Sequence, residues 1–151
     1  MADETIQSMF LSSERRLNRL KYFKRTLVIG VVAILLNVLF SNEDGSDNAF
    51  TLLLSIFFLV PSYFLDVQRL KDLDKDSTIA ILNVILGLVF MVFAQDSLSI
   101  EMMNYGIITG EARVYIFVSL IQTAIWVYLC FAEGTHGRNK YGEDPLEANE
   151  S

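Results

Sequence analysis

The sequence is poor in the residues that build disulfide frameworks and reactive sites. It has one cysteine, Cys130, and one histidine, His136. A single cysteine excludes an intramolecular disulfide framework and a cysteine-based metal site, and a lone histidine without an orienting partner is a poor catalyst. No His-Glu-x-x-His sequence, phosphate-binding loop or nucleophile elbow is present. We therefore expect no enzymatic activity, no bound metal and no cofactor.

Charged residues are missing from four long segments, residues 26–40, 49–65, 78–94 and 114–132. A helix of 17 residues rises about 26 Å, which is close to the roughly 30 Å hydrocarbon core of a bilayer. If four such helices formed the core of a soluble protein, only the loops would remain to face water. The pattern therefore predicts an all-α protein, an integral membrane four-helix bundle.

We expect residues 1–151 to form a single membrane domain with a cytosolic tail at 133–151. The predicted spans are residues 26–42, 49–65, 78–95 and 113–132.

Positive charge is almost absent from two of the three loops between these spans. Eleven of the twelve Lys and Arg residues precede the first apolar segment, lie in the central connector 66–77 or lie in the tail, and Arg113 is the exception. Loops rich in Lys and Arg stay in the cytoplasm. The distribution predicts a multi-pass protein with both termini and the connector on the cytoplasmic side.

The residues before the first span combine positive charge with apolar side chains. We expect an amphipathic interfacial helix at about 13–25, capped by Ser12 or Ser13, because such helices lie well on an anionic leaflet. The simpler interpretation of its charge is a topology signal that anchors the first span, and the alternative is specific lipid or partner binding. The predicted lipid-facing basic cluster is Arg15, Arg16, Arg19, Lys21, Lys24 and Arg25.

Three amides interrupt the apolar segments, Asn37, Asn83 and Gln122. Amides facing hydrocarbon would leave polar groups unpaired at a cost of several kcal/mol, about 2–7 each, so we expect these three in the bundle core. Hydrogen bonds between helices explain them without transport. Proton-coupled carriers usually place an ionisable residue in the membrane, and these segments have none. An oligomeric channel or small-solute transporter remains the alternative function.

Three segments resemble a known family. The connector reads Arg69-Leu-x-Asp72 and follows a span with a proline near its end, the N-terminal region reads Arg16-Leu-Asn-Arg19, and the tail reads EGTHGRNKYGEDP. Together they resemble the bacterial membrane family called domain of unknown function 805. The resemblance implies a small protein with four spans in the bacterial inner (cytoplasmic) membrane, and it supplies no activity.

The connector and the tail carry the most family-like residues and are predicted on the same side of the membrane. We expect the tail to fold back onto the connector, with Asp72 or Asp144 as the partner of Arg69, because an unpaired guanidinium near the membrane is costly. The ring of Tyr141 is expected to pack against a connector leucine. The candidate cytoplasmic platform is Arg69, Asp72, Asn139, Tyr141 and Asp144.

The sequence thus predicts a non-enzymatic membrane protein whose cytoplasmic face binds a partner or a lipid. The expected partners are membrane lipids and either a second copy or another membrane protein. No binding to nucleic acid is expected.

Overall fold

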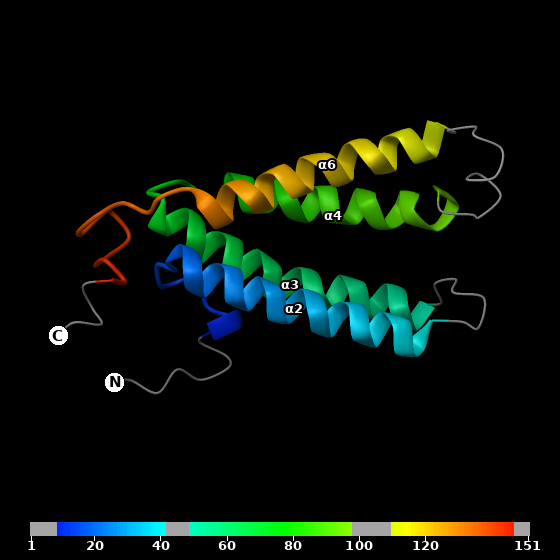
Figure 1. Ribbon diagram of the computed structural model, residues 1–151, viewed down its shortest axis with the longest axis horizontal. Helices are drawn as coiled ribbons and strands as arrows, with labels where there is room; N and C mark the ends of the chain where they lie inside the picture. The colour runs from blue at the N-terminus through cyan, green and yellow to red at the C-terminus, as the bar shows by residue number, and fades with distance from the viewer. Residues whose placement is uncertain (1–8, 42–48, 98–109, 147–151) are drawn as a thin grey trace.

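The computed structural model describes residues 9–41, 49–97 and 110–146, and these contain four long helices and no strand. They are α2 (Arg19–Phe40), α3 (Ala49–Asp72), α4 (Thr78–Ser97) and α6 (Gly110–Phe131). Figure 1 shows α2 beside α3 and α4 beside α6, and the two pairs are closest at the end where α3 passes into α4. The predicted all-α bundle is confirmed.

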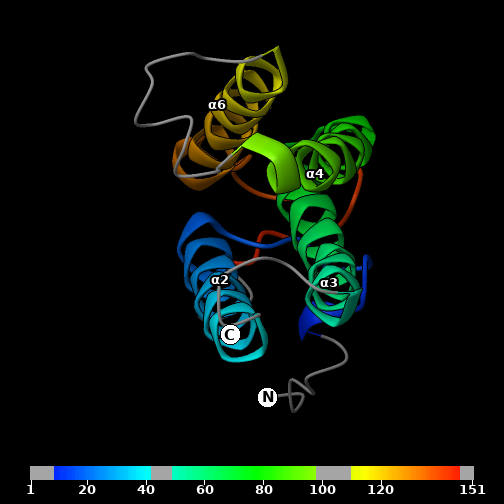
Figure 2. The ribbon, with the colours of Figure 1, turned by 90° about the vertical axis from the view of Figure 1, so that its right-hand side faces the viewer.

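Three of these helices have the length and composition of membrane spans. They are α2, α3 and the part of α6 from Arg113 to Phe131, whereas the apolar part of α4, Thr78–Val92, is shorter. The 22 residues of α2 rise about 33 Å, enough for a bilayer core of roughly 30 Å. Viewed along the helices, α4 contacts both α3 and α6, and so it joins the two pairs (Figure 2). The helices fit a multi-pass membrane bundle.

Each predicted span lies largely on one of these helices, and two helices extend beyond their spans by seven residues. α2 begins seven residues before the predicted span, at Arg19, and α3 continues through the connector to Asp72. Residue 42, the predicted end of the first span, lies outside the described residues. The polar connector is therefore mostly the last turns of a helix, followed by a short turn before α4.

The amphipathic helix predicted at 13–25 is observed only from Arg19 onward, as the first turns of α2, and residues 13–18 correct the prediction. Residues 11–18 are not helical, and α2 begins after Asn18, whose side chain accepts a hydrogen bond from the Lys21 N–H at 2.9 Å. Asparagine is among the best N-cap residues. The preceding backbone bonds to α3 instead: the Leu17 N–H donates to the Gln68 carbonyl at 3.1 Å. The basic residues from Arg19 onward thus belong to the first turns of a spanning helix.

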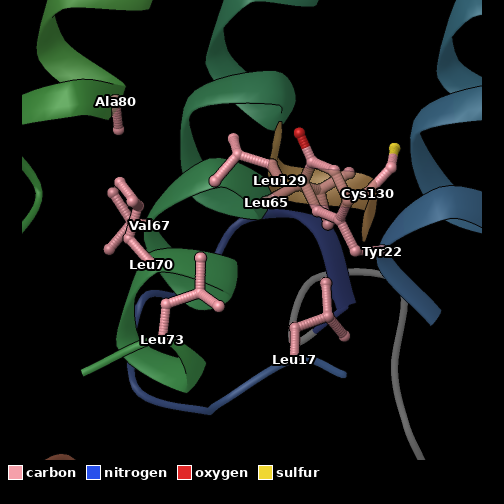
Figure 3. Packing of buried hydrophobic residues seen from close by; sticks show 9 residues of the cluster. All are labelled: Leu17, Tyr22, Leu65, Val67, Leu70, Leu73, Ala80, Leu129 and Cys130. Carbon is pink, nitrogen blue, oxygen red and sulfur yellow. The ribbon is translucent and has the colours of Figure 1, made fainter. Parts of the chain in front are cut away.

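Buried side chains gather at one end of the bundle, which we call the packed end and define as residues 12–25, 65–80 and 129–146. Its apolar core combines side chains from the N-terminal segment and all four helices (Figure 3). The core residues are Leu17, Tyr22, Leu65, Val67, Leu70, Leu73, Ala80, Leu129 and Cys130. Away from this end the helices expose large apolar side chains, such as Leu39 at 71%.

Candidate functional site

Arg69 lies at the centre of the packed end, in the last turn of α3, and is 0% exposed. Its Nε donates to the Leu129 carbonyl at 2.8 Å and its Nη1 to the Leu17 carbonyl at 3.2 Å. It also bonds to the Asp72 carboxylate and to the Ala132 carbonyl. One guanidinium therefore ties the N-terminal segment to the ends of α3 and α6, through charge-assisted hydrogen bonds of the stronger kind.

Arg16 approaches the same carboxylate from the opposite side. Its Nε donates to Asp72 Oδ1 at 3.2 Å, and Arg16 is only 7% exposed. Its Nη1 donates to the carbonyls of Gly137 at 2.7 Å and Gly142 at 3.1 Å, and its Nη2 to the Thr135 carbonyl at 2.5 Å. Arg16 therefore fixes the path of the tail.

Two buried cations thus share a single carboxylate. Removing a charge from water is costly unless it is paired and its remaining hydrogen-bonding groups are satisfied. Here Asp72 accepts from Arg16 on one oxygen and from Arg69 on the other, and backbone carbonyls take further donors of both. The hydrogen-bonding groups of this cluster are therefore used to hold the N-terminal segment, the end of α3 and the tail together.

The tail is held along its length by α3. The Asp72 carbonyl accepts from the Thr135 N–H at 2.9 Å and from its hydroxyl at 3.1 Å. Asn139 Nδ2 donates to the Lys71 carbonyl at 2.9 Å. The Gly134 backbone lies against the Asp72 carboxylate so closely that a Cβ there would be 2.2 Å from Oδ2. The tail and the end of α3 therefore pack as one unit.

Two glycines give the tail its turns. Gly137 has φ 70° and Gly142 has φ 131°, conformations that other residues rarely adopt. The Asn139 N–H donates to the Gly142 carbonyl at 3.0 Å, and the Gly142 N–H returns a bond at 3.1 Å. Arg16 binds the carbonyls of both glycines, Gly137 and Gly142.

Asp144 does not pair with Arg69. Its Oδ1 accepts from the Leu146 N–H at 2.9 Å and its Oδ2 from the Gly137 N–H at 3.0 Å. The hydrogen bond from Leu146, followed by that from Gly137 and the charge of Arg16, lowers the pKa of Asp144. Of the two partners predicted for Arg69, the structure selects Asp72.

Tyr141 lies beside lysines at the surface of the packed end. Its hydroxyl donates to Asp76 Oδ1 at 3.0 Å, and the ring centroid is 5.4 Å from Lys71 Nζ and 4.9 Å from Lys140 Nζ. Both ammonium groups are within cation–π range. All five residues of the predicted platform are thus brought together, with roles divided between the buried Arg69–Asp72 pair and the partly exposed turn.

A second polar cluster lies one turn deeper, where α2, α3 and α4 meet. Tyr22 Oη donates to Asp66 Oδ1 at 2.8 Å, and Asn83 Nδ2 donates to Asp66 Oδ2 at 2.7 Å. Asp66 is buried, and within the described residues Asn83 Oδ1 has no partner. The sequence placed Asn83 in the bundle core, but the role of Tyr22 was missed because nothing local links it to a residue 44 positions away.

The other two amides also face neighbouring helices. Asn37 Oδ1 accepts from the Ser55 hydroxyl of α3 at 3.3 Å, and Asn37 Nδ2 donates to the Ala33 carbonyl at 2.9 Å. Gln122 Nε2 is 3.6 Å from the position of a Cβ at Gly87 of α4. These positions suit contacts between helices.

The predicted lipid-facing basic cluster needs a correction at two positions. Arg16 and Arg25 are buried, at 7% and 9% exposure, and Arg25 Nη1 donates to the Met9 carbonyl at 3.2 Å. They turn inward because carbonyl and carboxylate acceptors lie within their reach. Of the remaining four residues, Lys21 is half-buried, and the exposed ones are Arg15, Arg19 and Lys24.

The chemistry of this end is that of a structural network. In the ranges that the structure describes, no group of His, Cys, Asp or Glu is arranged to hold a metal ion. Cys130 is buried and His136 is exposed on the tail. The arrangement gives the tail one defined shape at the end of the bundle.

Comparison with known proteins points to one family. No curated protein and no solved structure matches the chain. The family model described as "Protein of unknown function (DUF805)" matches residues 10–143. The match includes the N-terminal segment, the four helices and the tail through its second glycine turn. The chain therefore belongs to this family of proteins of unknown function.

Proposed function

We propose that this chain is a non-enzymatic protein of the bacterial inner membrane, with both termini in the cytoplasm, and that its packed end binds a cytoplasmic segment of another membrane protein. The orientation is supported by the eleven Lys and Arg residues on one side of the bundle against Arg113 on the other. In this orientation the packed end lies at the cytoplasmic surface of the bilayer.

The observation that carries the binding role is the immobilised tail. Arg16 and Arg69 use their donors on Asp72 and on carbonyls of the tail and of α6. A catalytic group needs a reactive atom in a cleft with capacity left for substrate, whereas these groups are committed to each other. The network maintains one conformation of the tail. A tail that is already ordered loses less conformational entropy when it binds a partner.

The tail presents both charge and apolar area on that fixed frame. Leu146 is 56% exposed, beside a turn whose exposed side chains include Arg138 and Glu143. An apolar contact with charged groups around it is the usual composition of a protein interface.

The polar groups of the helices favour packing over conduction. Ser119 and Thr123 donate to carbonyls of their own helix, at 2.6 Å and 2.7 Å. The Asn37–Ser55 bond joins two helices. Groups satisfied in this way have no need of a water-filled path, so the channel or transporter alternative has less support.

Photocrosslinking in native membranes tests the binding role. A photoreactive side chain at Leu146 or Arg138 is expected to give a discrete adduct with one protein, and the same probe at Leu39, at the other end of α2, is not. Arg16→Gln should abolish the tail adducts because it releases the tail. Adducts that are equally strong at all three positions, or that survive Arg16→Gln, would overturn the proposal.

Reporter fusions test the orientation separately. A reporter after Ser151 should behave as cytoplasmic, and one inserted at Gly45 or Gly106 as periplasmic. A periplasmic C-terminus would contradict the orientation without bearing on the network itself.

A further inference from the structure

A polar hollow and an apolar groove adjoin on the flank of the bundle formed by α3 and α4. The polar hollow has a volume of about 300 Å³ and its lining includes Lys71, Lys75, Ser77 and Tyr141. The apolar groove has a volume of about 450 Å³ and runs between the two helices. Tyr63 lines both. The hollow and the groove therefore meet at one side chain, with charge at the packed end and apolar side chains along the helices.

The groove has the composition of an acyl-chain site. Its lining is apolar except for the Tyr63 hydroxyl, and it includes Leu59 and Val60 of α3 with Ile81 and Ile85 of α4. On each helix the lining residues cover about two turns, which is about 10 Å of helix rise. That length matches the part of an acyl chain nearest its headgroup, if the chain lies along the bundle.

The hollow has the charge of an anion site. Lys71 Nζ donates to the Ser13 carbonyl at 2.6 Å, which uses one of the three N–H donors of an ammonium group. Lys75 is exposed. Asp76 also lines the hollow, but its carboxylate accepts from Tyr141 at 3.0 Å and pairs with Lys140 at 3.5 Å. The charge left for a ligand in the hollow is positive.

We propose that this flank is a binding site for an anionic phospholipid, with its phosphate and headgroup at Lys71 and Lys75 and one acyl chain in the groove between α3 and α4. A free phosphate would use only the hollow and a neutral apolar molecule only the groove, whereas a phospholipid fills both. The site differs from the N-terminal basic cluster and from the tail surface. It rests on the membrane location proposed above but requires no partner protein.

Native mass spectrometry of the purified full-length protein tests the site, with equimolar phosphatidylglycerol and phosphatidylcholine as the probes. The wild type is expected to retain phosphatidylglycerol preferentially. Lys75→Gln should lower that preference about fivefold, and Lys71→Gln combined with Lys75→Gln by more than about tenfold, since each basic residue near a membrane surface contributes at this scale. Arg113→Gln, which removes an exposed cation at the other end of the bundle, should leave the preference unchanged.

A second pair of variants tests the groove without changing charge. Ile85→Phe fills the groove and should lower the retained phosphatidylglycerol severalfold. Val92→Phe, seven residues further along the same helix and outside the groove, should not. Lys75 is exposed and the Ile85 side chain is 52% exposed, so neither variant endangers the fold.

Three results would overturn the proposal. One is equal retention of both lipids by the wild type, and another is an equal effect of Arg113→Gln and Lys75→Gln. The third is displacement of phosphatidylglycerol by inorganic phosphate combined with no effect of Ile85→Phe, which would assign the hollow to a free anion. Failure of the tail crosslinks changes none of these measurements, because the purified protein contains no partner.

Discussion

The packed end and the helices beyond it solve the burial of polar groups in different ways. At the packed end, Arg69, Asp72 and Arg16 are buried, Asp72 binds both arginines, and the arginines also bind carbonyls of the tail and of α6. Along the helices, polar side chains are few, and several bond to carbonyls one turn back, as Thr123 does to Ser119 at 2.7 Å. The first region is built like the core of a soluble domain, whereas the second relies on lipid to cover its apolar surface.

This difference has a consequence for stability. Substitutions at the packed end break bonds that no lipid can replace. Substitutions on the outer faces of the helices exchange one lipid contact for another, since lipid chains are as apolar as leucine.

The largest expected loss of stability is that caused by Arg69→Ala. It leaves Asp72 with one cation and removes the bonds to Leu129 and Ala132, and breaking a buried pair costs about 3–5 kcal/mol. The free energy of unfolding in detergent measures it, and amide exchange of residues 139–142 should accelerate. Arg19→Ala is the control, since Arg19 and Glu133 form an exposed pair at 3.9 Å that contributes under about 1 kcal/mol. Similar losses for both would erase the contrast between buried and exposed charge.

A pair of glycine variants compares the two regions directly. Gly134→Ala places a Cβ 2.2 Å from an oxygen of Asp72, and such overpacking costs about 1–3 kcal/mol. Gly30→Ala in α2 has open space, with nothing within 4 Å of its Cβ, so it should be neutral or gain up to about 1 kcal/mol. Thermal unfolding of the two variants checks this. Equal midpoints would show that the tail can move away from α3 at little cost.

A smaller effect is expected where two helices of the bundle approach closely. In Gly87→Leu the new Cβ would be 2.9 Å from Leu59 Cδ2 and 3.6 Å from Gln122 Nε2. The nearest atom is the end of a flexible side chain, so we expect a loss of about 1 kcal/mol, the low end for overpacking. Val89→Leu, on the same helix, should cost less. Thermal stability in detergent decides, and equal stability of the two variants would count against close packing at Gly87.

The smallest effect concerns Asp144 and pH. Its pKa is lower in the folded protein than in the unfolded chain because of the Leu146 and Gly137 amides. The stabilisation it supplies is therefore present above the ordinary carboxyl range near about pH 4, and it is lost as the pH falls through the lowered pKa. The unfolding midpoint should drop between about pH 5 and about pH 3 more in the wild type than in Asp144→Asn. Identical drops would assign the acid sensitivity to other groups.

The fold could be predicted from sequence because it depends on composition within single segments. Four stretches without charge indicate four helices, whatever they contact. The start of α2 could not be predicted in this way. Ser12 and Asn18 are both good caps, and Asn18 prevails because residues before it bond to α3, as Leu17 does to Gln68.

The candidate site was only partly predictable for the same reason. Arg69 and Asp72 are three apart on one helix, so their pairing follows from local geometry. Arg16 was assigned to lipid because it stands among other cations, and its partners lie 56 to 126 residues away. The close approach of Gly134 to Asp72 leaves no local signal, because it depends on where the tail crosses α3.

The sequence separation between Arg16 and its partners in the tail also determines when their hydrogen bonds can form during synthesis of the chain. The carbonyls of Thr135, Gly137 and Gly142 are made 119 to 126 residues after Arg16. At a synthesis rate of about 5–20 residues per second, that interval is on the order of ten seconds. During it the helices can enter the bilayer, while the guanidinium of Arg16 stays hydrated and without those acceptors. The packed end is thus completed last, because the tail can bind Arg16 only after α6 has been synthesised.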